Sequence, residues 1–398
     1  DKGVTLYAEK TTNLDRFKDD FTQYKIAHKG DLVFNSMNMI VGAVGVSNYF
    51  GCVSPVYYTY YEGLNNSKRT KFYEYLFRCK TVQGVLYSLG RGLIAIDRGE
   101  GRYNTLRLKV SRDDLRSLKL PFPSISEQTA IAEFLDCKTA HIDQAIKQKE
   151  RLIELLKERR QILIHNAVTR GLNPNVKMKH SGVDWIGEIP DHWEVKKLRY
   201  LANCFPSNVD KHSKENESKV RLCNYTDVYK NDFISDDMEL MEATASIEQI
   251  KKFSLKKGDI VITKDSETAS DIAVPAFVIE NLTNVVCGYH LAVIRPNAGV
   301  NGKYLFRALQ CKIFNMQFEI CSNGITRVGL GNSDLRKGQF LLPPMNEQIS
   351  IAKHIDWVSQ KIAAAISLKE KEIEKLKEYK AVLINSAVTG KIKVSDNN

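Results

Sequence analysis

The feature that most constrains the fold of this chain is an internal repeat. Residues 123–169 and 343–389 align without a gap at a constant offset of 220, and about twenty of the 47 positions are identical. The identities include Pro123, Glu127, Gln128, Ile131, Ala132 and Asp136, which match Pro343, Glu347, Gln348, Ile351, Ala352 and Asp356. Self-similarity of this extent indicates a chain built from two related halves.

Each copy of the repeat carries the start and stop signals of one long helix. Ser126 and Asn346 occupy equivalent positions where we expect helix caps, each followed by a glutamate that suits the positive end of the helix dipole. Gly171 and Gly390 are the stop signals downstream. The span of about 42 residues predicts a helix roughly 60 Å long, far above the usual length.

Heptad spacing of apolar residues explains why these helices are so long. A continuous apolar seam flanked by mixed charges is typical of a coiled coil, and the economical partner of one copy is the other copy. We therefore expect the two helices to pair antiparallel and to relate the halves by a pseudo-twofold axis. The alternative is two separate helices, each packed on its own domain. The seam residues are Leu135, Ile142, Ile146, Ile153, Leu156 and Leu163 in the first copy, and Ile355, Ile362, Ile366, Ile373, Leu376 and Leu383 in the second.

A fainter repeat lies upstream of each helix. Residues 29–34 resemble residues 257–262, residues 75–78 resemble residues 304–307, and residues 114–116 resemble residues 334–336. Each resemblance indicates the same order of elements: a Gly-Asp turn into a strand, a short helix, and a turn before the proline. The fold class predicted for the whole chain is α+β, with two α/β domains separated by two long helices.

Composition narrows the range of partners. The chain has 398 residues, a formal net charge of +11 and a hydrophobic fraction of 43%, so it can bury real cores and favours an anionic partner. The sequence contains no run of about eighteen apolar residues, which is the length that a membrane-spanning helix needs. The eight cysteines form no C-x-x-C pair, which predicts free thiols in a reducing cytoplasm and no metal site.

Taken together, these motifs resemble those of the specificity subunits of type I restriction-modification systems. The matching parts are Trp185–Pro190 followed by residues 192–198, the Gly-Asp strand of both modules, the Pro…Glu-Gln start of both helices, and the Ala-Val-Thr exits at 167–169 and 387–389. The first module has no counterpart of the 185–198 segment, so we expect its N-terminal part to be missing from this chain.

The resemblance implies a division of labour along the chain. Residues 1–119 are expected to be target-recognition domain 1 and residues 173–340 target-recognition domain 2 with its opening linker. Residues 120–172 and 341–398 are expected to be the spacer helices. Each recognition domain is then expected to read one half of a bipartite double-stranded DNA target. The helices are expected to space the halves and to dock two methyltransferase subunits, and a motor-nuclease subunit joins the full complex.

Two loops in each domain offer side chains that can reach bases or phosphates. Arg, Lys, Asn and Gln are the usual readers of base edges, and glycines let the backbone approach phosphates. A solvated loop side chain is the alternative role for any one of these residues, and Tyr289 and His290 are expected to be structural. The predicted DNA-binding residues are Asn35, Ser36, Asn38, Arg91, Arg98, Arg102, Tyr103 and Asn104 in the first domain, and Lys264, Ser266, Thr268, Ser270, Asn323, Thr326, Arg327 and Asn332 in the second.

Catalytic alternatives find little support in the sequence. The chain lacks the N/D-P-P-Y/F motif of amino-methyltransferases and a Walker loop. Asp191 with Glu217 and Lys219 superficially fits a nuclease spacing, but Asp191 lies in a turn and the first module has no equivalent. We therefore expect a cytoplasmic protein that is not an enzyme and needs no cofactor. The remaining alternative is a coiled-coil scaffold that binds only proteins.

Overall fold

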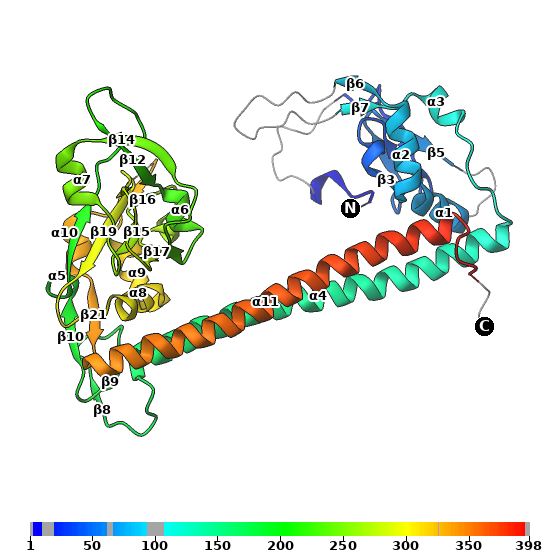
Figure 1. Ribbon diagram of the computed structural model, residues 1–398. Helices are drawn as coiled ribbons and strands as arrows, with labels where there is room; N and C mark the ends of the chain where they lie inside the picture. Colours follow the sequence, from blue (N-terminus) through cyan, green and yellow to red (C-terminus); the bar gives the residue numbers. More distant parts are fainter. Residues whose placement is uncertain (1–2, 10–19, 62–66, 94–106, 325, 395–398) are drawn as a thin grey trace. The chain divides into compact units, whose positions relative to one another are not determined.

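A computed structural model describes residues 3–9, 20–61, 67–93, 107–324 and 326–394. The chain folds as two compact units, coloured by sequence in Figure 1: Asp1–Arg151 with Leu368–Asn398 (unit 1), and Leu152–Ser367 (unit 2). The boundary falls inside two long helices, α4 (Ile125–Arg170) and α11 (Met345–Val388), so each unit contains part of both.

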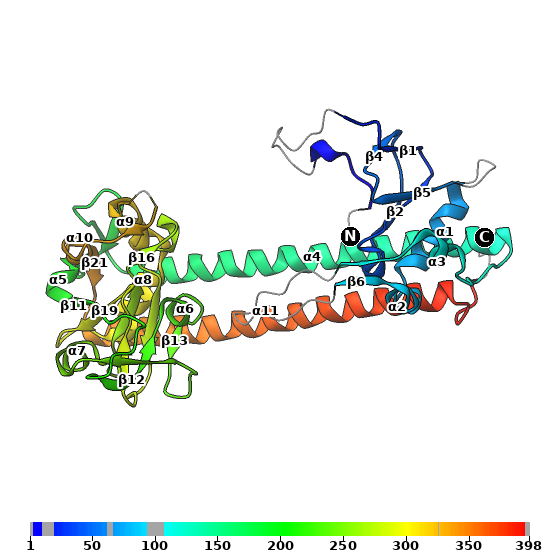
Figure 2. The ribbon, with the colours of Figure 1, turned by 90° about the horizontal axis from the view of Figure 1, so that it is seen from above.

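Unit 1 has a small antiparallel sheet in which β2 lies between β3 and β5, with the β1–β4 pair beside it (Figure 2). Helix α1 packs on β2 and β3. The Phe34 ring meets Phe77 edge-on at a centroid distance of 4.8 Å, which joins the sheet to the helix. The elements are η1 (Tyr7–Glu9), β1 (Lys25–Ala27), β2 (Leu32–Asn35), η3 (Met39–Val41), β3 (Val44–Val46), β4 (Gly51–Val53), β5 (Tyr57–Tyr60), α1 (Ser67–Arg78), α2 (Lys80–Leu89), β6 (Arg91–Leu93), β7 (Arg107–Lys109) and α3 (Arg112–Arg116).

Unit 2 is larger and contains a five-stranded sheet in the order β11-β19-β15-β17-β13 and a three-stranded sheet in the order β14-β12-β18. Its elements are β8 (Met178–His180), β9 (Glu188–Pro190), β10 (Glu194–Lys197), α5 (Leu198–Leu201), β11 (Ala202–Pro206), β12 (Ser218–Cys223), α6 (Tyr225–Tyr229), β13 (Phe233–Ile234), β14 (Met241–Ala245), α7 (Ile247–Phe253), β15 (Ile260–Thr263), β16 (Asp265–Ser266), η4 (Ala269–Asp271), β17 (Pro275–Val278), β18 (Val285–Cys287), β19 (Leu291–Pro296), α8 (Gly302–Gln310), α9 (Lys312–Cys321), β20 (Val328–Gly329), α10 (Asn332–Lys337) and β21 (Gln339–Leu342).

The central strand β15 of unit 2 is buried on both faces. Successive side chains of a strand point to opposite faces, and here Ile260 and Ile262 enter one apolar core while Val261 enters the other. The first of these cores also contains Ile164 and Val168 of α4 and, from α11, Ile351, Ala352 and Ile355. In unit 2 the ends of the long helices are therefore part of the core of the domain.

The two units share the frame that the fainter repeat predicted. Gly30 and Gly258 have positive φ values of 95° and 91°, and each precedes a buried aspartate that comes directly before the central strand, β2 or β15. Asp31 accepts a hydrogen bond from the backbone N–H of His28, and Asp259 accepts one from Lys256. Because a side chain at these glycines would be strained, the Gly-Asp pair fixes the same turn in both units.

The long helices begin slightly earlier than the sequence indicated. Ser126 and Asn346 are not caps, because they lie in the first turns of α4 and α11. In α4 the capping role belongs to Ser124, whose Oγ accepts from the Glu127 N–H at 3.3 Å while the Glu127 carboxylate accepts from the Ser124 N–H at 3.0 Å. Ser124 lies three residues before Glu127 and can form both of these hydrogen bonds, whereas Ser126 is adjacent to Glu127 and cannot.

The glutamine of the Glu-Gln pair at the start of each long helix has the same role in both copies of the repeat. The buried Gln128 side chain donates to the Pro123 carbonyl at 2.9 Å, and Gln348 donates to the Pro343 carbonyl at 2.8 Å. Each glutamine thereby ties the preceding proline loop to the first turn of its helix, which accounts for the matching Pro and Gln in both copies.

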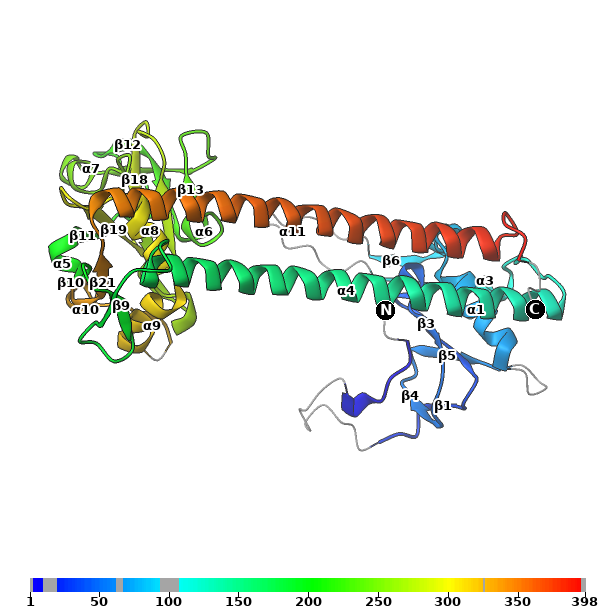
Figure 3. The ribbon, with the colours of Figure 1, turned by 90° about the horizontal axis from the view of Figure 1, so that it is seen from below.

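Helices α4 and α11 lie side by side and run in opposite directions within each unit (Figure 3). In unit 1 Lys149 pairs with Glu372, and Asp143 pairs with Lys380. The residue numbers fall along α4 as they rise along α11, so the two helices are antiparallel there. In unit 2, residues around Leu163 and Val358 line one small shared cavity. All twelve predicted seam residues are buried or half-buried. Lys149 and Lys369, which interrupt the seam, both bind the Glu372 carboxylate.

The segment of residues 185–195 joins the ends of the two long helices inside unit 2. Trp193 is fully buried and its ring lies against Gly171, where a Cβ atom would approach the ring at 3.2 Å. The Trp193 indole N–H donates to one oxygen of Glu347 at 3.0 Å, and His192 contacts the other oxygen at 2.7 Å. One tryptophan therefore links the exit of α4 to the start of α11.

The matching aspartates of the repeat hold helix α1 in unit 1 and helix α8 in unit 2, but with different partners. In unit 2 Asp356 accepts from Arg307, a guanidinium that is only 2% exposed, at 2.7 and 3.0 Å. In unit 1 Asp136 accepts from the Tyr75 hydroxyl at 2.6 Å and lies 3.7 Å from Lys71. Desolvation of Tyr75 and its bond to Asp136 raise the pKa of that phenol.

These unequal partners predict unequal effects of the same substitution. Asp356→Ala leaves the buried Arg307 charge without its main counterion and should cost about 3–5 kcal/mol of unfolding free energy. Asp136→Ala removes a bond to a neutral hydroxyl and should cost about 1 kcal/mol. Urea unfolding of the two variants measures both, and an equal loss in the two would contradict the assigned roles.

Candidate nucleic-acid interface

The same backbone hydrogen bond joins the two predicted loops in each unit. In unit 1 the Val110 N–H donates to the Ser36 carbonyl at 3.2 Å, and in unit 2 the Leu330 N–H donates to the Lys264 carbonyl at 2.9 Å. Val110 and Leu330 are equivalent in the repeat at offset 220. The loop after the central strand therefore lies against the segment that precedes α3 or α10.

In unit 2 this junction is reinforced by a short strand pair. Asp265 and Ser266 form β16, which pairs with β20 in the register Asp265↔Gly329 and Ser266↔Val328. Arg327, which comes directly before β20, is thereby brought next to Lys264 and Asp265, some sixty residues away in the sequence. The pairing places two predicted cations at one edge of the domain.

A chain of polar contacts then fixes the Arg327 side chain. The Asp265 carboxylate contacts Lys264 Nζ at 2.8 Å and His290 Nδ1 at 3.1 Å. The other ring nitrogen of His290, Nε2, lies 3.0 Å from an Arg327 guanidinium nitrogen. Arginine is only a donor, so Nε2 accepts and Nδ1–H donates to Asp265. The exposed Arg327 is held in place before any ligand arrives.

Aromatic side chains surround this polar chain. The Tyr289 ring is 50% exposed and lies 4.3 Å from the His290 ring and 5.7 Å from Lys264 Nζ. Tyr225 and Tyr229 of α6 stack at a centroid distance of 5.5 Å, and the Tyr225 hydroxyl shares a hydrogen bond with Ser266. The neighbouring Asp271 carboxylate raises the pKa of Tyr229, so this phenol stays a donor.

The other residues predicted in unit 2 are divided between the surface and the interior. Ser266 is only 6% exposed, and its hydroxyl faces Tyr225. Thr268 donates to Asp271 at 2.7 Å and shares a hydrogen bond with Ser270. The exposed members of the predicted set are Lys264 in part, and Thr268, Ser270, Asn323, Thr326, Arg327 and Asn332 in full.

In unit 1 the structure describes only some of the predicted DNA-binding residues. Asn38 and Arg91 are exposed, and Asn35 is half-buried with its side-chain oxygen accepting from the Met37 N–H. Ser36 is 1% exposed, so its backbone carbonyl and not its hydroxyl contributes to the junction. Arg98, Arg102, Tyr103 and Asn104 lie outside the described residues.

Unit 1 also has cations near this junction that the loop-based prediction missed. Lys25 Nζ and the Arg112 guanidinium lie 5.3 and 5.1 Å from the centre of the Tyr58 ring. Burial, followed by repulsion from Arg112 and Lys109, lowers the pKa of Lys25. Cations that repel one another across a partly exposed surface favour binding of an anion there.

The residues named by the nuclease alternative do not come together in one group. Asp191 lies 3.8 Å from Lys177, whereas Glu217 accepts from Thr244 and pairs with Lys214. Across the described ranges, the His, Cys, Asp and Glu side chains form no group of three or more that could hold a metal ion. No helix within those ranges is long and apolar enough to cross a membrane.

Comparisons with known proteins agree with the sequence motifs. Residues 190–378 match the family model for the type I restriction modification DNA specificity domain. The type I restriction enzyme MjaVIII specificity subunit of Methanocaldococcus jannaschii is 23% identical over 73% of this chain and 65% of its own length. The EcoKI specificity subunit of Escherichia coli is 23% identical over 64% of this chain and 53% of its own length. This chain thus spans about half to two thirds of those relatives.

Solved structures show the same fold. A chain from a study of complex assembly and conformational transition of the type I R-M system superposes with a TM-score of 0.71 at 14% identity, covering 94% of this chain and 85% of that one. The HsdS subunit of Thermoanaerobacter tengcongensis gives a TM-score of 0.53 at 16% identity, covering 94% and 84%. The predicted α+β fold is confirmed.

Residues 190–378 are thus similar to the type I restriction modification DNA specificity domain. The chain as a whole is similar to type I specificity subunits, so the resemblance drawn from its motifs is confirmed. The matched region contains all the contacts that join Lys264, Asp265, His290 and Arg327, together with Trp193 and the first part of α11.

The contacts of His290 with Asp265 and Arg327 predict which of its two ring nitrogens carries the proton. The neutral His290 ring should carry its proton on Nδ1, because Asp265 accepts from that nitrogen and Arg327 donates to the other. Long-range proton–nitrogen NMR of labelled histidine reports the tautomer directly. Asp265→Ala should move the proton toward Nε2. Asp271→Ala serves as the control, because it leaves the contacts of His290 with Asp265 and Arg327 in place. A wild-type His290 protonated on Nε2 would contradict this arrangement.

Proposed function

We propose that this chain is a DNA-binding specificity subunit without catalytic activity, whose two recognition domains each read one half of a bipartite duplex target. The observation that carries the proposal is the junction of the two loops, built by the same backbone bond in both units. Two equivalent junctions in one chain suit a target with two half-sites. The order of elements in the two modules is also the order found in the type I specificity subunits.

The chemistry of the junction in unit 2 fits sequence readout. An arginine can bind guanine in the major groove through two parallel hydrogen bonds. Arg327 is exposed but held by His290, so little conformational entropy is lost when it binds. Tyr289 and Lys264 beside it can contact sugars and phosphates, which fix the position of the duplex.

The paired helices are the part of the chain suited to space the two readers. We propose that the seam of α4 and α11 forms an antiparallel coiled coil with pseudo-twofold symmetry, supported by the opposite directions of the helices within each unit and by the buried seam residues. The reciprocal use of Asp136 and Asp356 in the two units supports the same symmetry.

Docking of two methyltransferase subunits is proposed along the outer faces of these helices, with a motor-nuclease subunit joining the cytoplasmic complex. Apolar side chains that stay exposed in a folded chain mark surfaces that bind partners. Such residues on the two helices include Leu152, Leu155, Ile162, Trp357, Leu368, Tyr379 and Val382. A scaffold that binds only proteins would use the same surfaces, but it would not need the two basic loop junctions.

The proposal predicts that the half-sites can be altered one at a time. With the methyltransferase present, Arg327→Ala should weaken or relax recognition of one half-site by about 1–3 kcal/mol and leave the other unchanged. Arg91→Ala, in the other unit, is the reciprocal variant and should affect only the other half. Selection from a random duplex library measures both. If Arg327→Ala disturbed both halves equally, or if no duplex were selected at all, the proposal would be wrong.

A further inference from the structure

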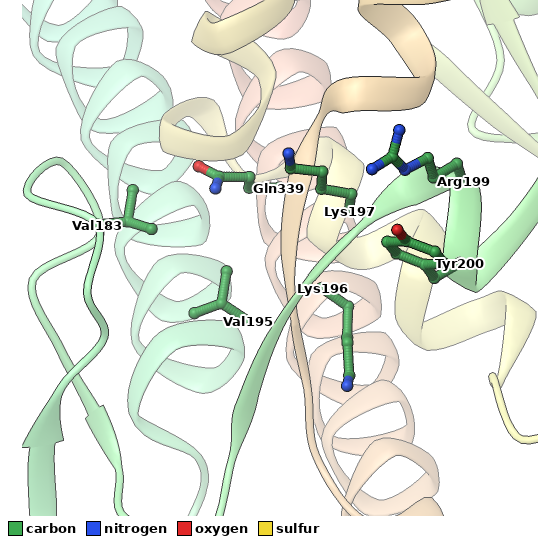
Figure 4. A pocket seen from close by; sticks show the side chains of 7 residues that line it. All are labelled: Val183, Val195, Lys196, Lys197, Arg199, Tyr200 and Gln339. Carbon is green, nitrogen blue, oxygen red and sulfur yellow. The ribbon is translucent and has the colours of Figure 1, made fainter.

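Unit 2 has an open pocket of about 280 Å³ beside strand β10, where β10 pairs with β21 (Figure 4). Three of its lining residues are cations and none is a carboxylate. The pocket is lined by Val183, Val195, Lys196, Lys197, Arg199, Tyr200 and Gln339.

Two of these cations have no counterion within the part of unit 2 that the structure describes. Lys196 pairs with Glu194 at 2.7 Å, but neither Lys197 nor Arg199 has an ion pair there. The side chains of Lys197 and Arg199 extend to the same side of β10 (Figure 4). Like charges held at one site repel each other, and an anion between them removes that repulsion.

The other lining residues are two neutral donors, Tyr200 and Gln339, and two valines. The Tyr200 ring is 61% exposed and lies 4.8 Å from the Arg199 guanidinium, which holds that cation beside it. The backbone of Gln339 is hydrogen-bonded to Gln317, which fixes its position at the rim of the pocket, and its side-chain amide points toward Val183 (Figure 4). Charged and neutral donors around one open space match the several acceptor oxygens of a phosphate.

We propose that this pocket binds a backbone phosphate of the duplex whose bases are read by the Arg327 loop. The inference rests on the proposed function and adds a second contact to it. Helix α10 packs on α5 and connects the reading junction to the pocket. Asn332 begins α10 next to the junction, and the carbonyl of Gly338, which follows α10, accepts a hydrogen bond from the Leu198 N–H at 2.7 Å.

The separation of the pocket from the reading junction is similar to the distance between the major groove of a duplex and the phosphates at its edge. Helix α10 has six residues, which span about 9 Å at 1.5 Å per residue. The major groove of B-DNA is about 12 Å wide, so a side chain in the groove and a phosphate on its edge are separated by a similar distance. The exposed Arg336 and Lys337 of α10 continue the positive surface between them. A row of cations fits a polyanion better than a single acidic side chain of a protein partner.

The test compares two double variants of the full chain. Lys197→Ala with Arg199→Ala empties the pocket of its unpaired cations, and Lys256→Ala with Lys257→Ala removes two exposed lysines outside it. Binding of a fluorescent duplex is measured by anisotropy over a series of salt concentrations. The pocket variant should lower the slope of log affinity against log salt by about one per lost phosphate contact, with an unchanged preference between specific and random duplexes. The control should keep the wild-type slope, and thermal melting should show both variants folded.

The outcomes separate the pocket from the proposed function. If the wild-type chain binds duplex DNA and the pocket variant keeps its slope, the phosphate site is wrong while the proposed function stands. If the pocket variant keeps its slope but no longer associates with the methyltransferase, the pocket takes an acidic protein surface and the proposal is also wrong. If the wild-type chain, with its methyltransferase, binds no duplex at all, both proposals fail.

Discussion

The contact between α4 and α11 is the interaction on which the rest of the structure depends. Most of the stability of a helix in a protein comes from burying an apolar face rather than from helix propensity. Each helix buries its seam on the other within both units. The salt bridges of Glu372 with Lys149 and Lys369 interrupt the seam with charge. A polar layer of this kind favours one register of the helices over its neighbours.

The domains of the two units attach to this helix pair through equivalent positions, but with different chemistry. In unit 2, α4 and α11 contribute side chains to the main core, and a buried arginine binds Asp356. In unit 1 the same position of the repeat binds a tyrosine, and Thr81 at the start of α2 donates to Asn385 of α11 at 2.6 Å. A shared frame with divergent partners lets the two domains differ in their loops while both stay fixed to the helices.

Local patterns were sufficient to predict much of this fold. The Gly-Asp turns were predictable because only a residue tolerant of positive φ fits there, and the long helices because heptad spacing and terminal glycines persist over the whole repeat. The caps were misplaced by two residues because Ser124 and Ser126 are chemically alike in sequence, and only the reach of Glu127 decides between them.

The candidate site was less predictable because its contacts are between residues far apart in the chain. Ser36 and Ser266 have loop-like sequence neighbours, yet both are buried once the two loops meet. Asp265 and Tyr225 gave no signal as single residues. His290 was expected to be structural, but nothing in the sequence indicated that its partners are Asp265 and Arg327. A strand pair of only two residues on each side, β16 with β20, creates this neighbourhood, and such a pair leaves almost no pattern in the sequence.

We propose that the helix pair sets the distance between two readers, and lengthening both helices tests this proposal most directly. One heptad would be inserted after Glu158 in α4 and a second after Ile362 in α11, which lies opposite within the same antiparallel register. Seven residues add about 10 Å, equivalent to about three base pairs at 3.4 Å each. Selection from a random duplex library, with the methyltransferase present, should return both original half-sites separated by a longer gap. Recovery of the original gap with unchanged affinity would contradict the account.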